Sequence, residues 1–111
     1  MNTEMKEYKI IFDESSPCWM DDKEYNRHMV RMQQNYCNEL LKARGHLLLS
    51  DVYDKLGIPV TDKNVYGAGW VFSMNDHDMN LVDFHIDEEM DGDNFVLKFK
   101  VYDNIINILR A

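Results

Sequence analysis

Apolar and half-apolar side chains recur with helical spacing in the long uninterrupted segment that starts near residue 21. They are separated by steps of four, three, four and four, the period at which side chains share one face of an α-helix. We call this set the apolar stripe: Tyr25, Met29, Met32, Tyr36 and Leu40. Val30, Cys37 and Leu41 widen it, and charged or amide side chains fall opposite. The pattern predicts a long amphipathic helix whose apolar stripe is buried against the core.

Polar residues and glycines mark the ends of this helix and of a second, shorter one. Asp21 and Asp22 offer carboxylates that can cap a helix start and oppose the positive end of its dipole. Gly45 is the left-handed residue that ends the long helix. After a short apolar linker, Ser50 is an N-cap and Gly57 a second helix end. The sequence therefore predicts one long helix followed closely by a helix of two turns.

Alternation of apolar and polar side chains predicts strands on both sides of the helical region. The predicted strands are residues 8–12, 66–73, 81–87 and 95–102, with a tight turn at 103–104 leading into a last strand at 105–109. One strand, two helices and then four strands in a meander is an order typical of the α+β class. We expect the two helices to pack on one face of a mainly antiparallel sheet of four to five strands. The apolar stripe should contact the sheet face that carries Phe84, Leu97 and Phe99.

Chain length and composition favour a single soluble domain. A chain of 111 residues can bury one hydrophobic core, so we expect one α+β domain over residues 1–111, with residues 1–6 frayed. The start lacks the basic-then-apolar layout of a signal peptide, and no apolar run approaches the roughly 20 residues of a membrane span. We therefore expect a cytoplasmic protein without membrane contact, in which Cys18 and Cys37 are free thiols.

Negative charge is concentrated in the last third of the chain. The formal net charge is −8, and between Met74 and Asp93 there are eight carboxylates and no lysine or arginine. Because binding to phosphate needs clustered basic side chains, we expect no direct nucleic-acid binding. A helix–turn–helix interpretation meets the same objection, since the short helix carries Asp51 and Asp54. An acidic surface could instead mimic nucleic acid toward a DNA-binding protein.

Several segments resemble an uncharacterised family of small proteins from Gram-positive bacteria and their phages. The resemblance covers roughly residues 25 to 109. It rests on Leu41 to His46, Leu49 to Gly57, Gly69-Trp70-Val71, Val82-Asp83-Phe84 and the closing hairpin. That family has no assigned activity, so the resemblance implies phage or prophage ancestry and carries over no catalytic residues.

Three patterns could carry chemistry, and each has an ordinary structural explanation. The segment from Asp87 to Gly92 spaces its acids and glycine as an EF-hand calcium loop does, but position 12 is Lys98 instead of glutamate. The four histidines share no metal-ligand spacing. Cys37 lies beside core positions, where cysteine acts as a small hydrophobe rather than a nucleophile. We therefore assign no catalytic residue, no metal site and no cofactor.

The function that remains is that of an acidic accessory protein, of phage or prophage origin, that acts through contacts with another protein. The candidate contact residues are the acids of the predicted loop: Asp87, Glu88, Glu89, Asp91 and Asp93. Because these acids repel one another, a basic partner would relieve the repulsion. Replacing Asp87, Glu88, Glu89 and Asp91 with Asn or Gln should preserve or raise the melting temperature. The sequence is also compatible with a homodimer. The alternative is a small enzyme or a ligand- or cation-binding domain that uses this loop with His77 and His85.

Overall fold

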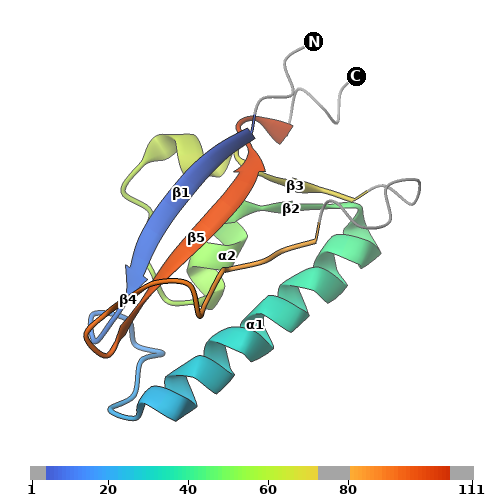
Figure 1. The fold of residues 1–111 in the computed structure, drawn as a ribbon. Helices are drawn as coiled ribbons and strands as arrows, with labels where there is room; N and C mark the ends of the chain where they lie inside the picture. The colour runs from blue at the N-terminus through green and yellow to red at the C-terminus, as the bar shows by residue number, and fades with distance from the viewer. Residues whose placement is uncertain (1–4, 73–80, 106–111) are drawn as a thin grey trace.

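The computed structural model of the protein describes residues 5–72 and 81–105 (Figure 1). Its elements in chain order are β1 (Met5–Phe12), α1 (Lys23–Arg44), β2 (His46–Leu48), α2 (Leu49–Lys55), the 3-10 helix η1 (Lys63–Tyr66), β3 (Gly69–Val71), β4 (Met90–Asp91) and β5 (Asn94–Tyr102). The strands form one antiparallel sheet in the order β1-β5-β3-β2, and β4 also pairs with β5. The predicted α+β class, two helices packed with an antiparallel sheet, is confirmed.

The first and last described strands form the longest pairing of the sheet. β1 and β5 pair from Met5 opposite Tyr102 to Phe12 opposite Phe95. This pairing joins opposite ends of the chain. Because β5 lies between β1 and β3 and residues 81–86 form no strand, the predicted meander of the last four strands is wrong. Tyr8 lies opposite Phe99 and is buried with it, as the alternation in both strands predicts. The predicted strands 8–12 and 95–102 are confirmed.

Helix α1 has the predicted ends but not the predicted buried face. The Asp22 carboxylate accepts a hydrogen bond from the Tyr25 N–H at 3.1 Å, and Gly45 has φ 81° with its N–H donating to the Leu41 carbonyl. The fully buried residues of α1 are Asn26, Val30, Cys37 and Leu41. Tyr25, Met32 and Tyr36 of the apolar stripe are 49%, 56% and 48% exposed. The prediction that this stripe faces the core is therefore wrong for Tyr25, Met32 and Tyr36, whereas Met29 and Leu40 do pack against the core.

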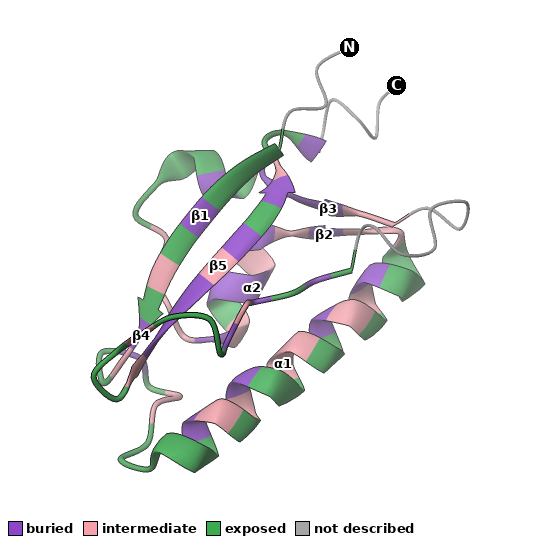
Figure 2. Cartoon of the chain, in the orientation of Figure 1, coloured by how far each residue is buried: buried purple, intermediate pink, exposed green. Residues whose placement is uncertain are grey.

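The rotation of α1 has a physical explanation. Successive residues are about 100° apart around a helix, so two adjacent apolar lines compete for the core. The line that is buried carries compact side chains, Val30, Cys37 and Leu41, whereas tyrosine and methionine fall on the exposed flank. Figure 2 shows the buried positions along the edge of α1 that faces the sheet. Met29 and Leu40 lie between the two lines, half-buried and packed against the core.

The segment after α1 is more ordered than its sequence predicts. The linker after Gly45 forms strand β2, and α2 begins at Leu49, so Ser50 lies inside the helix and does not cap it. Strand β3 is shorter than the predicted strand 66–73, because Tyr66 belongs to η1; Ser73 lies outside the described residues. A Cβ on Gly69 would lie 2.2 Å from the Leu47 carbonyl oxygen, so only glycine permits the close approach of the β2 and β3 backbones at this position.

Residues 81–86 show the predicted alternation of burial but do not form the predicted strand. Val82, Phe84 and Ile86 are buried, while the segment passes between α1 and β5 (Figure 1). The Asn38 side chain accepts from the Val82 N–H at 2.6 Å and donates to the Val82 carbonyl at 3.0 Å. Gln34 Oε1 accepts from the Phe84 N–H at 2.8 Å. Side chains of α1 thus make most of the backbone hydrogen bonds that a neighbouring strand would otherwise make to this segment.

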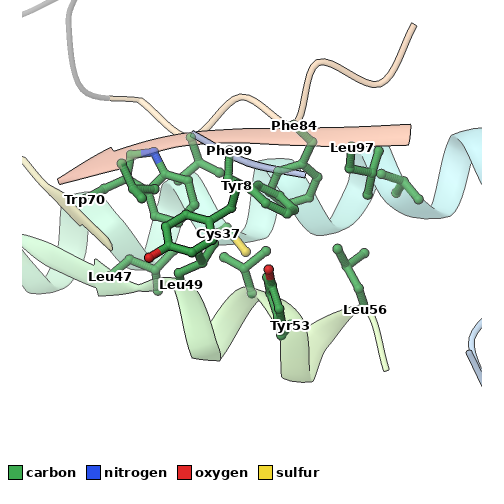
Figure 3. Close-up of a cluster of buried hydrophobic side chains, with 14 of the residues drawn as sticks. Tyr8, Cys37, Leu47, Leu49, Tyr53, Leu56, Trp70, Phe84, Leu97 and Phe99 are labelled. Atoms are coloured by element: carbon green, nitrogen blue, oxygen red, sulfur yellow. The ribbon is translucent and has the colours of Figure 1, made fainter. Parts of the chain in front are cut away.

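Phe99 lies at the centre of the core (Figure 3). Its ring centroid is 5.3 Å from that of Phe84, 5.9 Å from Tyr53 and 6.4 Å from Trp70. The predicted strand 105–109 begins at Ile105, which is fully buried and donates its N–H to the Gly67 carbonyl at 2.9 Å; its remaining residues lie outside the described part. None of the helices in the described residues is long and apolar enough to cross a membrane.

Candidate functional site

Three places on the surface have the composition of a binding site, and the first is the exposed flank of α1. The apolar stripe runs along this flank, with Tyr25, Met32 and Tyr36 each about half exposed. The ammonium of Lys55 lies 4.9 Å from the centre of the Tyr36 ring and holds that ring at the side of α2. Tyrosine and methionine are enriched in protein interfaces, so this flank has the chemistry of a contact surface.

The second place is the acidic hairpin at β4, where the structure supplies the cations that the local sequence lacks. Asp87 forms ion pairs with Arg27, Nε to Oδ1 at 3.1 Å, and with Arg31, both on α1. The hydrogen bond from Arg31 is the main cause that lowers the pKa of the Asp87 carboxyl. Arg27 also bonds Glu24 at 2.6 Å, and this bond is the main cause that raises the pKa of the Arg27 guanidinium.

The other predicted acids divide into paired and unpaired carboxylates. Glu88 meets His85 Nδ1, and Glu89 lies 3.6 Å from both Lys9 and Lys98. Within the described residues, Asp91 and Asp93 make no ion pair. Arginine or lysine thus offsets the expected mutual repulsion for Asp87 and Glu89, and neutralising Asp87 should cost stability instead of preserving it.

Asp91 and Asp93 retain uncompensated charge at the tip of the hairpin. Together with Asp13 and Glu14 they line a hollow of about 300 Å³ beside Trp19. The turn between β4 and β5 begins at Gly92, whose φ of 64° is readily adopted only by glycine. This tip is the part of the predicted acidic surface that could attract a basic partner.

The third place is a pocket of about 260 Å³ on the outer side of the sheet. It is lined by Met5, Trp70, Leu81, Asp83, His85, Lys100 and Tyr102. His85 has φ 53°, a strained conformation for a non-glycine residue, and its N–H donates to Asp83 Oδ1 at 2.8 Å. Alternation along β5 sets Lys100 on the face opposite Phe99, but no local pattern places Lys100 beside His85, because nothing local shows that residues 81–86 pack against α1. His77 lies outside the described residues.

The described residues contain no group of three histidine, cysteine or acidic side chains arranged to hold a metal ion. Cys18 is half-buried and Cys37 is buried, and both are free thiols. Burial raises the pKa of the Cys37 thiol from 9.0 to about 11. A thiol that stays protonated at neutral pH is a poor nucleophile, so Cys37 acts as a core residue.

The raised pKa of Cys37 predicts that the protein becomes less stable at alkaline pH. Below pH 9.0 both the folded and the unfolded thiol are protonated; between pH 9.0 and about 11 only the unfolded chain releases the proton. The free energy of unfolding should therefore fall over this range, by about 1.4 kcal/mol for each unit of difference in pKa. Urea denaturation at about pH 8 and about pH 10 measures the fall. In the Cys37→Ala variant the free energy of unfolding should fall less over the same pH range than in the parent protein. An equal fall in both proteins would show that Cys37 does not cause it.

The chain matches a protein family, and that family has no known activity. The family described as "Family of unknown function (DUF6353)" matches residues 1–109. No curated protein and no solved structure matches the chain.

Proposed function

The chain belongs to this family of unknown function, DUF6353, and we propose that it acts as a small protein-interaction module whose contact surface is the apolar stripe of α1. One observation carries the proposal: three of the five residues of the apolar stripe, which has the spacing of a buried helix face, are exposed on the outside of α1. Tyr25, Met32 and Tyr36 are each about half exposed along one flank. A helix on the surface of a domain normally turns such a stripe inward. An exposed apolar row of this kind is typical of a surface that a second protein covers.

The acidic tip is a second contact surface in this proposal. Asp91 and Asp93 make no ion pair with another described residue, so a basic protein partner would gain favourable electrostatic contacts there. Asp87, Glu88 and Glu89 are already paired within the chain and have less to gain. A cytoplasmic location and phage or prophage ancestry belong to the same proposal; the acidic composition and the resemblance of residues 25 to 109 support them.

The pocket beside His85 favours a second candidate function, the binding of a small ligand. Asp83, His85, Lys100 and Tyr102 converge there next to the indole of Trp70, as polar groups do in ligand sites. It ranks second because two of its polar side chains already have partners within the chain: the Asp83 carboxylate accepts from the backbone N–H of His85, and the His85 imidazole contacts Glu88.

A photo-crosslinking amino acid in place of Met32 tests the proposed surface. Tyr66 is a matched control, because it is 58% exposed where Met32 is 56% exposed and it lies on η1, not on α1. In the native host, irradiation should join a protein to position 32 and not to position 66. Equal yields at both positions, or no product at position 32, would contradict the proposal.

A further inference from the structure

Building on the proposed contact surface, we propose that the occupant of the apolar stripe is a second copy of this chain, with the two α1 helices packed antiparallel about a two-fold axis near Met32. The arrangement of charge on α1 carries this inference. The rest of the chain is strongly acidic, but the segment from Asp21 to Arg44 is close to neutral. Its charged residues are Lys23, Arg27, Arg31, Lys42 and Arg44 against Asp21, Asp22, Glu24 and Glu39.

Two acidic copies with a net charge of −8 each repel one another over most of their surfaces. This repulsion is weak at the flank of α1, because the segment from Asp21 to Arg44 carries no net negative charge. It is also where the exposed apolar side chains Tyr25, Met32 and Tyr36 are found. A contact between copies on this flank thus buries apolar surface at little electrostatic cost.

The charges on α1 also decide the orientation of the two helices. Acids cluster at the start of the helix, at Asp22 and Glu24, and basic residues cluster in its last turn, at Lys42 and Arg44. Lys42 and Arg44 make no ion pair with any described residue of their own chain. In a parallel pair, like charges would meet at both ends. In an antiparallel pair each acidic start meets a basic end, and the two helix dipoles oppose one another favourably.

One register satisfies the apolar and the charged residues together. With the two-fold axis beside Met32, that side chain meets its own copy, and Met29 faces Tyr36 of the second copy. The same register puts Glu24 near Lys42 and Asp22 near Arg44, since each pair lies at nearly equal distances along the helix on either side of the axis. A two-fold axis makes every such contact occur twice, which is the usual geometry of a homodimer.

Sedimentation analysis over about two orders of magnitude in concentration tests the association. The mass should rise from 13.2 kDa toward twice that value. Met32→Asp should weaken the association by at least about tenfold, because it places a charge beside its own copy at the centre of the contact. Tyr66→Asp is the matched control and should leave it unchanged. A protein that stays monomeric at all concentrations, or that responds equally to both substitutions, would overturn the proposal.

Charge reversal tests the orientation. Glu24→Lys and Lys42→Glu should each weaken the dimer, and the double variant should restore it to within about a factor of two. A double variant that is weaker than either single variant would exclude the antiparallel register. Thermal unfolding of each variant by circular dichroism separates loss of association from loss of fold.

The crosslinking experiment distinguishes failure of this inference from failure of the proposed function. A monomer that is crosslinked through position 32 to a different protein would leave the contact surface standing and exclude the second copy as its occupant. A monomer with no product at position 32 would exclude both.

Discussion

Replacing Phe99 with alanine should lower the free energy of unfolding by about 3–5 kcal/mol, the usual cost of removing a fully buried phenylalanine. The Phe99 side chain is completely buried, and the rings of Tyr53, Trp70 and Phe84 surround it (Figure 3). These residues come from α2, from β3 and from the segment beside α1, so no single element can move to fill the cavity. Urea denaturation of the Phe99→Ala variant measures the loss.

Met32→Ala is the natural comparison, because the sequence pattern placed Met32 in the core and the structure leaves it 56% exposed. Its cost should stay within about 0.5 kcal/mol, as for most surface substitutions. A loss above about 2 kcal/mol for Met32→Ala would show that α1 turns its apolar stripe inward after all. A small loss for Phe99→Ala would show that the core is not centred on that ring.

Replacing Asn38 with alanine should destabilise the protein by about 2–4 kcal/mol, because it leaves two backbone groups without partners. The Asn38 amide both accepts from the Val82 N–H and donates to the Val82 carbonyl. Val82 is 2% exposed, so water cannot replace these bonds without opening the segment. Chemical denaturation measures the loss, and hydrogen exchange at the Val82 amide should accelerate.

Asn35→Ala provides the control, since Asn35 lies on the same helix but is exposed and makes no side-chain hydrogen bond to a described residue. That substitution should be neutral or slightly stabilising, because alanine has the higher helix propensity. Asn38→Asp keeps the acceptor for the Val82 N–H but sets a carboxylate oxygen against the Val82 carbonyl. It should therefore be as damaging as alanine. Equal effects of Asn35→Ala and Asn38→Ala would show that the bonds to Val82 contribute nothing.

The hydrogen bonds from Asn38 also position two of the candidate sites, the pocket beside His85 and the acidic hairpin at β4. They fix residues 81–86 along α1, and this placement brings Asp83 and His85 to the pocket and Asp87 to Arg27 and Arg31. Loss of the Asn38 side chain should thus disturb the pocket and the acidic hairpin while leaving the exposed flank of α1 in place.

The sequence by itself determined the features that depend on near neighbours along the chain. The ends of α1 were predictable, because Asp22 and Gly45 act on backbone groups within four residues of themselves. The alternation in β5 was predictable, because neighbouring side chains of a strand point to opposite faces. The α+β class followed from the order of such elements.

Only the tertiary structure decided which of several compatible partners each element has. Two apolar lines on α1 fit the same helical period, and packing against the sheet selected Val30, Cys37 and Leu41 over the apolar stripe. The alternation in residues 81–86 is compatible with pairing to a strand and with packing along the side of a helix. Hydrogen bonds from the amide side chains of Asn38 and Gln34 fix the segment along α1. The acids near β4 have no basic neighbours in sequence, yet Arg27, Arg31, Lys9 and Lys98 reach them in space. These choices depend on contacts between residues far apart in the chain, which no local pattern encodes.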